Sequence, residues 1–280
     1  MRNGQLPTCP DCASFEQHCA DIERCTVCGL GRTVTVTRPA DEQNYLAPDQ
    51  AGQPRLTYFK KLFRWYFRRL PPGRALDVGC ARGEFVREFA GHGWTAHGLD
   101  AYRGFPADNQ HFFRADLASF QTTERYDVIT MIHAFEHLAD PIGALEHVRG
   151  LLQPAGVLLI VVPHFQGRWS RQLGRRWDML NPEEHPFHYT PAALRNVLHR
   201  GGFSVTTERT YSGYSVPSPW QVTLSERQFY ERGFGAYQPV RSLIFRANRW
   251  VRPLVNRGVD WSNDGAEIHT VSTPGVQETK

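Results

Sequence analysis

The stretch Arg74-Ala-Leu-Asp-Val-Gly-Cys-Ala-Arg-Gly83 decides the fold, together with the acid at Asp100. Its first half reads as a buried strand after a Pro-Pro-Gly turn, and the residues after it place apolar side chains on one helical face. Gly79 and Gly83 let the connecting turn pass close to a bound ligand. A nucleotide-like ligand sits at the carboxyl ends of the strands in such a unit. There, Asp100 ends the second strand and can accept both ribose hydroxyls of an adenosine.

The same turn argues against a dinucleotide-binding enzyme. That class uses G-x-G-x-x-G, whereas the run from Gly79 is G-C-A-R-G, with Ala81 at the second glycine position. Asp77 also places a negative charge beside the turn. A pyrophosphate would be repelled there, but a cationic aminoacyl sulfonium would not.

Outward from this turn, strand and helix patterns alternate along the chain. Further strands are expected at 94–100, 112–115, 126–132, 156–162, 203–209 and 266–272, and helices at 58–70, 83–90, 141–152 and 190–200. Alternation of this kind predicts an α/β fold in which helices cover a mainly parallel sheet.

Composition bounds the function. The chain has 280 residues, 41% of them hydrophobic, and a net charge of +4 from 32 basic and 28 acidic residues. This mild excess permits an anionic partner without demanding a nucleic acid. No apolar run is long enough to span a bilayer, and the start lacks the apolar core of a signal peptide, so we expect a cytoplasmic protein.

Four cysteines form two paired knuckles, Cys9-x2-Cys12 and Cys25-x2-Cys28. In a reducing compartment such pairs indicate metal ligands more than disulfides. Tetrahedral zinc takes four thiolates at this spacing. A site closed by four thiolates has no open position, so we expect the zinc to be structural.

Taken together, several motifs resemble class I S-adenosylmethionine-dependent methyltransferases. They are Asp77-x-Gly79-x3-Gly83, Asp100, Ala115-Asp116-Leu117, and Tyr126-Asp-Val leading to Glu136-His-Leu-x-Asp140-Pro. The resemblance implies a Rossmann-like seven-stranded sheet with an antiparallel last strand, preceded here by a small zinc ribbon. It implies S-adenosylmethionine as cofactor, with the ribose at Asp100 and the adenine amino group at Asp116. The implied cofactor positions are Asp77, Gly79, Cys80, Ala81, Gly83, Asp100, Ala101, Asp116, Leu117 and Ile132.

Candidates for the chemistry follow the fourth strand. His133, Glu136 and His137 stand at i, i+3 and i+4, which would place them on one face of a helical turn. His137 and Glu136 would then act as a base and its orienter. Alternatively, all three would bind a divalent cation such as Mg²⁺, although quinone O-methyltransferases, which this segment resembles, usually carry a carboxylate at the position of His133. His185 and His188, before the penultimate helix, form a second candidate set.

We therefore expect a zinc ribbon over 1–37, a linker over 38–57 and a methyltransferase domain over 58–273, with a flexible tail at 274–280. Residues 211–263 would form an acceptor-side insertion. Its arginines from Arg241 to Arg257 predict either a helix packed on the domain or a peripheral membrane contact.

The leading hypothesis is O-methylation of a small-molecule or saccharide acceptor, since the ribbon and turn together resemble the ubiquinone-type and sugar-modifying subgroup. One alternative is an RNA methyltransferase targeted by the ribbon. The segment Ile132-His-Ala-Phe and the mild charge argue against it. A sugar C-methyltransferase is a further enzyme alternative. A regulatory module that binds the cofactor without turnover is the non-enzyme alternative, which the complete set of acids and glycines disfavours.

Overall fold

A mixed seven-stranded sheet forms the centre of the protein. The computed structural model describes residues 14–19, 21–34, 52–101, 110–177, 179–212 and 264–275. The strands run in the order β10-β11-β8-β7-β4-β5-β6, and β11 is antiparallel to both its neighbours. Their bounds are β4 (Arg74–Val78), β5 (Thr95–Asp100), β6 (Phe112–Arg114), β7 (Tyr126–Ile132), β8 (Leu152–Pro163), β10 (Phe203–Tyr211) and β11 (Glu267–Pro274). The predicted seven-stranded α/β sheet is confirmed.

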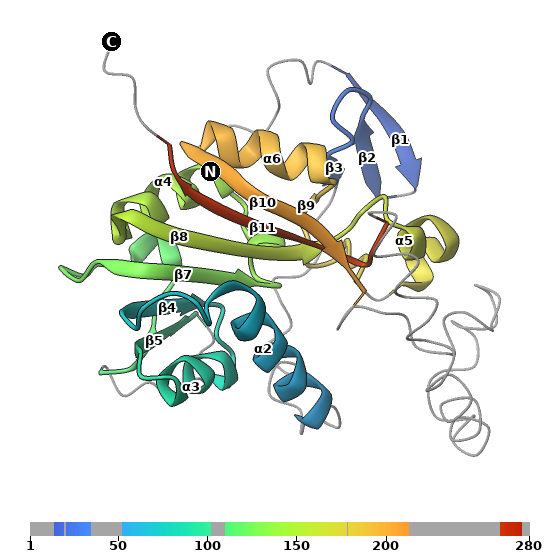
Figure 1. The fold of residues 1–280 in the computed structure, drawn as a ribbon. Coiled ribbons are helices and arrows are strands. Elements are labelled where there is room, and N and C mark those ends of the chain that lie inside the picture. Colours follow the sequence, from blue (N-terminus) through green and yellow to red (C-terminus); the bar gives the residue numbers. More distant parts are fainter. Residues whose placement is uncertain are drawn as a thin grey trace, which may run out of the picture.

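Helices cover both faces of this sheet (Figure 1). One face packs against α2 (Gly52–Tyr66) and α3 (Glu84–Gly91), and the other against α4 (Pro141–Leu151) and α6 (Pro191–Arg200). Asp140 and Thr190 each accept a hydrogen bond from the backbone N–H three residues on, which fixes where α4 and α6 begin. Helix α2 begins six residues before the expected helix and so extends into the expected linker.

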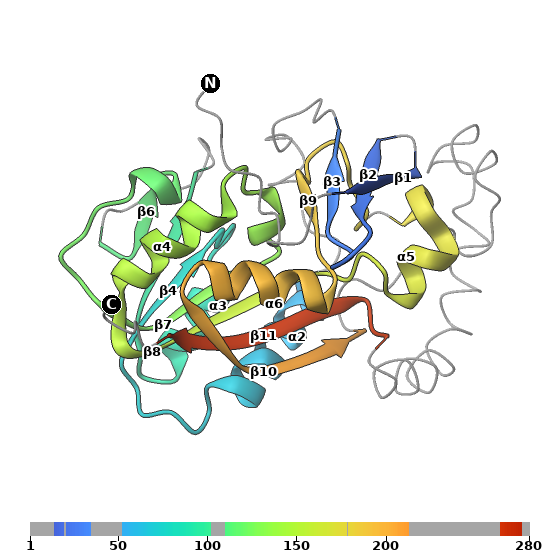
Figure 2. The ribbon, with the colours of Figure 1, turned by 90° about the horizontal axis from the view of Figure 1, so that it is seen from above.

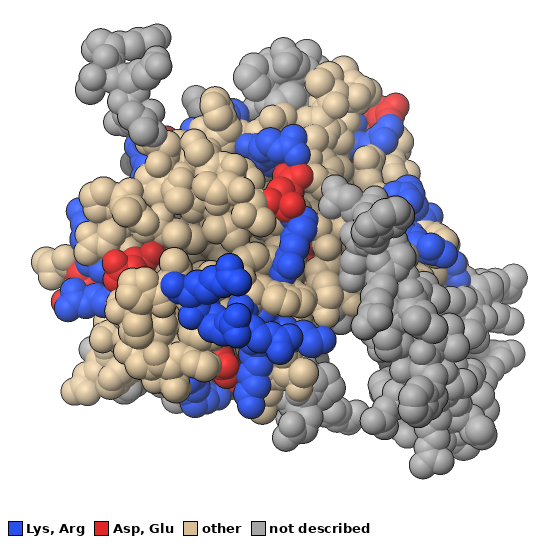
Figure 3. Space-filling view, viewed as in Figure 1, with Lys and Arg blue, Asp and Glu red and all other residues tan. Residues whose placement is uncertain are grey.

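A basic surface lies over α2. Lys60, Arg64, Arg68 and Arg69 are exposed, whereas Phe59, Leu62 and Phe63 are buried against the sheet. Figure 3 shows the lysine and arginine side chains gathered on this face. The helix therefore presents its apolar stripe to the core and its charges to solvent. Among the helices of the described ranges, none is long and apolar enough to cross a bilayer.

The N-terminal ribbon is built into the domain. Its strands are β1 (Phe15–Cys19), β2 (Ile22–Cys25) and β3 (Gly31–Thr33). They form a four-stranded sheet with β9 (Phe187–His188), which pairs with β3 and belongs to the segment before α6. Ile22 is fully buried in a cluster whose other buried members come from residues 165–266, among them Phe165, Leu173, Trp177 and Leu180. So short a ribbon buries little surface alone, and docking supplies its core. Figure 2 shows it beside α5 (Arg168–Leu173), at one end of the large sheet.

Candidate active site

The glycine turn leaves β4 and enters α3 in a left-handed conformation. Gly79, Ala81 and Gly83 all have positive φ values, of 73°, 47° and 71°. The backbone N–H of Gly79 donates to the Leu99 carbonyl at 2.8 Å, which ties the turn to β5. A Cβ atom at Gly79 would lie 2.6 Å from the Cβ of Ala134. Both the φ value and the space at this position therefore require glycine.

Two buried carboxylates flank the turn. Asp77 accepts a hydrogen bond from the Thr130 hydroxyl at 2.6 Å, and Asp100 accepts one from the Ala81 backbone N–H at 2.9 Å. Burial, together with the charges of these two carboxylates, raises the pKa of the Cys80 thiol. The turn is thus a region of negative potential. It suits a cationic aminoacyl sulfonium and opposes a pyrophosphate.

The remaining cofactor candidates lie along the same edge of the sheet. Ala101 and Asp116 are exposed, Leu117 is buried, and Ile132 is half-buried at the end of β7. Within the described residues the Asp116 side chain makes no capping hydrogen bond. Its carboxylate therefore has acceptor capacity for a ligand.

These residues fit an adenosyl cofactor. Asp100 is a buried carboxylate at the end of β5, and a carboxylate is the kind of group that accepts ribose hydroxyls. Leu117 supplies an apolar surface beside the carboxylate of Asp116. S-adenosylmethionine, whose sulfonium is cationic and whose adenosine carries two ribose hydroxyls, matches this arrangement.

His133 stands between two glutamates in a strained backbone conformation. Its φ is 52°, in the left-handed region that a non-glycine residue rarely adopts. The ring Nδ1 lies 3.4 Å from Glu136 Oε1 and the Nε2 lies 3.6 Å from Glu267 Oε1. Burial alone would lower the pKa of His133, but the hydrogen bonds and charges of the two glutamates outweigh it and raise the pKa to about 10. His133 is therefore an imidazolium near neutral pH.

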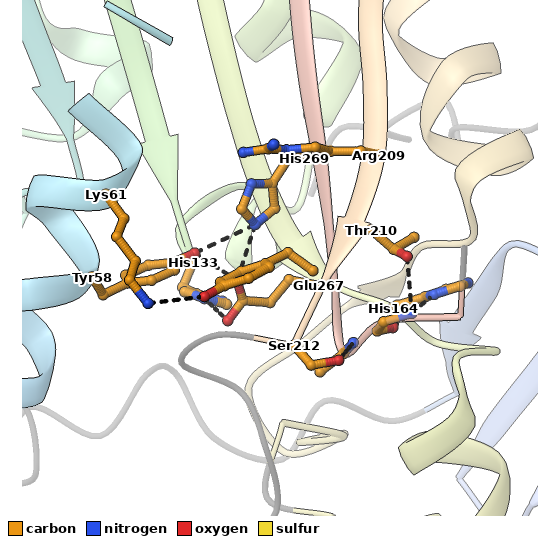
Figure 4. A network of polar contacts seen from close by, with 12 residues as sticks. Tyr58, Lys61, His133, His164, Arg209, Thr210, Ser212, Glu267 and His269 are labelled. Carbon is orange, nitrogen blue, oxygen red and sulfur yellow. Dashed lines mark hydrogen bonds and ion pairs between the residues drawn. The ribbon is translucent and has the colours of Figure 1, made fainter. Parts of the chain in front are cut away.

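A chain of buried hydrogen bonds holds Glu267 (Figure 4). The Tyr58 hydroxyl donates to Glu267 at 2.5 Å, and His269 Nε2 lies 3.0 Å from the same carboxylate. The Tyr66 hydroxyl accepts from Arg209 Nε at 2.7 Å and lies 2.9 Å from His269 Nδ1. The ionised Glu267 can only accept, so a neutral His269 carries its proton on Nε2 and its Nδ1 accepts from Tyr66. His269 therefore donates through Nε2 to Glu267.

The pKa shifts agree with this placement of protons. Burial outweighs the neighbouring carboxylate and lowers the pKa of His269. Burial would raise the pKa of Glu267, but hydrogen bonds from His133 and His269 hold it well below its usual range. The motifs after the fourth strand gave no indication of this network. Its signal in the sequence is Glu267-x-His269, a pair of ionisable residues inside an expected strand.

Glu136 pairs with His133, whereas the sequence suggested His137 as its partner. The segment after β7 is a short 3₁₀ turn, Phe135–His137, and not the α-helical turn that would align i, i+3 and i+4. His137 instead faces the Glu184 carbonyl, 3.3 Å from its Nδ1. The His137 ring also packs edge-on to His185, with centroids 4.6 Å apart.

A small buried cavity adjoins this group. Among the described residues, Glu136 Oε2 and the Tyr189 hydroxyl are buried without a hydrogen-bond partner. Both residues line the cavity, with His185 and His188 and with apolar side chains from Phe165, Trp177, Met179, Leu180 and Phe187. An unpaired acceptor and an unpaired donor in an apolar cavity indicate a place for a ligand hydroxyl or a water molecule.

The side chains beside this cavity do not fit Mg²⁺. Potential ligand atoms of Glu136, His137 and His185 lie within 4.8 Å of one another. Two of the three are imidazole nitrogens, whereas Mg²⁺ prefers oxygen ligands. His133, the third residue of the expected cation set, has both ring nitrogens directed at carboxylates, Nδ1 at Glu136 and Nε2 at Glu267.

Half of the expected zinc site lies in the described residues. Cys25 Sγ accepts backbone N–H groups from Val27 at 3.3 Å and Cys28 at 3.4 Å. Burial opposes ionisation of Cys25, but these N–H donors outweigh it and lower its pKa. This knuckle fits a metal thiolate. Cys9, Cys12 and the arginines from Arg241 to Arg257 lie outside the described residues.

Comparisons with known proteins were made on the sequence and on the fold. A family model described as a methyltransferase domain matches residues 53–208. A ubiquinone biosynthesis O-methyltransferase of Cereibacter sphaeroides is 33% identical over 179 residues, which cover 55% of this chain and 68% of that protein. The enzyme of the same description from Ruegeria pomeroyi is 24% identical over 171 residues, covering 55% of this chain and 68% of that protein.

Two solved structures share the fold. One comes from the complex of the Haloferax volcanii Trm112 methyltransferase activator with a putative methyltransferase. It has a TM-score of 0.57 and 15% identity and covers 88% of this chain and all of the other. The other is a SAM-dependent methyltransferase from Archaeoglobus fulgidus, with a TM-score of 0.51, 17% identity and coverage of 78% and 94%.

Proposed function

The chain belongs to the methyltransferase-domain family and is a class I S-adenosylmethionine-dependent methyltransferase, and we propose that it methylates a hydroxyl of a small-molecule or saccharide acceptor. The cofactor, when bound, supplies the methyl group from its sulfonium. Asp77 and the turn through Gly79 and Gly83 would hold its aminoacyl part, and Asp100 its ribose. Asp116 and Leu117 would receive the adenine.

The observation that carries the hydroxyl assignment is the unpaired oxygen of Glu136. Its Oε1 faces His133, and its buried Oε2 has no partner among the described residues. When the acceptor oxygen bonds to the methyl carbon and the carbon–sulfur bond breaks, the hydroxyl proton needs a nearby base. Glu136 Oε2 would take that proton, and the imidazolium of His133 would stabilise the carboxylate beforehand.

The other histidines have supporting roles in this proposal. Burial, reinforced by the neighbouring His137, holds the pKa of His185 well below its usual range. A neutral His185 can exchange hydrogen bonds with an acceptor but cannot neutralise one. We also propose that Cys25 and Cys28, with Cys9 and Cys12, hold a structural zinc ion.

The test combines binding and transfer. Wild-type protein and the Glu136→Gln variant are titrated with S-adenosylhomocysteine. Both are then offered a panel of phenols, catechols and monosaccharides with S-adenosylmethionine labelled in its methyl group. We expect the wild-type protein to place the label on an oxygen of one acceptor. The Glu136→Gln variant should lose this transfer but still bind S-adenosylhomocysteine. Label on carbon or nitrogen would overturn the assignment of a hydroxyl acceptor.

A further inference from the structure

The ribbon reaches the acceptor side through its third strand. β3 pairs antiparallel with β9, with Gly31 opposite His188. The backbone N–H of Thr33 donates to the Pro186 carbonyl at 2.9 Å, and the Thr190 hydroxyl donates to the Cys28 carbonyl at 2.8 Å. The segment that carries His188 is therefore held along its length by the ribbon.

The Thr33 hydroxyl decides where the proton of His188 lies. Its oxygen is 2.6 Å from the His185 carbonyl oxygen and 3.0 Å from His188 Nε2. A carbonyl can only accept, so the single hydroxyl proton of Thr33 goes to His185. His188 Nε2 must then carry a proton and donate it to Thr33. This fixes the tautomer of His188 and leaves Nδ1 as the acceptor of the ring.

Packing fixes the orientation of the same ring. A Cβ atom at Gly31 would lie 2.9 Å from the Cβ of His188 and 2.7 Å from Phe165, so the strand passes directly against both. The Phe165 and His188 rings are 5.3 Å apart. Burial lowers the pKa of His188 to about 3, which keeps the ring neutral. The ring also lines the cavity that Glu136 and Tyr189 line.

We propose that Thr33 is a positioning residue of the acceptor site, fixing His188 as its Nε2–H tautomer so that Nδ1 is the hydrogen-bond acceptor the ring offers to the acceptor molecule. The role in acceptor binding rests on the proposed function, whereas the tautomer itself does not. The ribbon is then a wall of the active site. Its third strand is committed to the domain and is not free to recruit a separate target.

The tautomer is measured directly by nitrogen NMR. Full-length protein labelled with ¹⁵N-histidine is compared with Thr33→Val, Thr33→Ser and Thr26→Val, and His188→Gln assigns the signal. Thr26 is the matched control, since its hydroxyl lies in the same ribbon and bonds Ser14 at 2.8 Å. We expect protonated Nε2 and unprotonated Nδ1 in wild type, Thr33→Ser and Thr26→Val. In Thr33→Val we expect a mixture of tautomers or a shift to Nδ1–H.

Two results would overturn the proposal. One is an Nδ1–H ring in the wild-type protein, which is decisive even if Thr33→Val does not fold. The other is an unchanged His188 signal in a folded Thr33→Val variant. With an acceptor from the panel, Thr33→Val should lower kcat about fivefold to tenfold and leave the affinity for S-adenosylhomocysteine unchanged. Loss of cofactor binding in the wild type would instead refute the proposed function and leave the tautomer result standing.

Discussion

The cofactor edge and the acceptor edge of this sheet are built in different ways. The cofactor edge is the proposed cofactor site at the carboxyl ends of β4 and β5. It comes largely from one βαβ unit, in which Asp77, Gly79, Gly83 and Asp100 are close in sequence and backbone groups make several of the contacts. The acceptor edge is the proposed acceptor site around Glu136 and His188. Its side chains come from α2, the end of β7, β9, β11 and the ribbon. Local motifs can specify the first edge, while only the folded chain assembles the second.

The largest expected effect separates the two edges at Glu136. Glu136→Gln should lower kcat with a hydroxyl acceptor by roughly 10²–10⁴-fold, because the acceptor proton loses its base. The affinity for S-adenosylhomocysteine should stay within about twofold of wild type. Loss of cofactor binding in Glu136→Gln would contradict the separation of the two edges, since the residue would then belong to both. Steady-state kinetics and calorimetric titration on one preparation measure the two quantities.

The converse change is Asp100→Ala. It should weaken S-adenosylhomocysteine binding by about 100-fold or more, because hydrogen bonds to a charged acceptor are worth about 1.5–3 kcal/mol each. Asp127→Ala is the control, since Asp127 lies at the opposite end of the sheet and accepts the Arg74 N–H. Wild-type affinity in a folded Asp100→Ala variant, judged by circular dichroism, would refute the cofactor assignment.

Short motifs predicted the glycine turn and the strands around it because their geometry is local. The strands from β4 to β7, the two glycines in left-handed conformations and the buried acids at 77 and 100 all follow from one stretch of sequence. Pairing across the fold was not predictable in that way. Glu267 lies 209 residues from its donor Tyr58, and Thr33 lies 155 residues from His188. No spacing pattern encodes such contacts.

The 3₁₀ turn after β7 shows why the pairing of Glu136 was also out of reach. The i, i+3, i+4 rule assumes an α-helix. His133 adopts a left-handed conformation at the strand end, and only Phe135–His137 forms a helical turn. The pairing of Glu136 with His133 therefore depends on backbone geometry that the residue spacing does not specify.

A stability measurement tests whether the ribbon belongs to the acceptor edge. Ile22→Ala should lower the free energy of unfolding by about 2–4 kcal/mol, because the side chain is fully buried among residues of the methyltransferase region. Val27→Ala, at a position in the same ribbon that is 61% exposed, should change it by less than about 0.5 kcal/mol. Urea unfolding should show one transition in both. A separate ribbon transition would mean that the two parts fold independently.

A smaller catalytic effect is expected at Glu267. Glu267→Gln keeps the shape of the side chain but removes the charge that faces His133. We expect kcat to fall about tenfold, less than for Glu136→Gln, because Glu267 acts on the acceptor only through His133. The matched control is Glu208→Gln on β10, where Glu208 pairs with Arg195 away from this network. Equal rates in the two variants would remove Glu267 from the acceptor edge.

The most direct test of the central claim is calorimetric titration of S-adenosylhomocysteine into wild-type, Glu136→Gln and Asp100→Ala proteins, each checked for zinc and for folding. Two edges with separate roles predict about one cofactor per chain, with equal affinity in wild type and Glu136→Gln and an affinity about 100-fold or more weaker in Asp100→Ala. A folded, zinc-loaded wild-type protein that binds no S-adenosylhomocysteine would contradict the account.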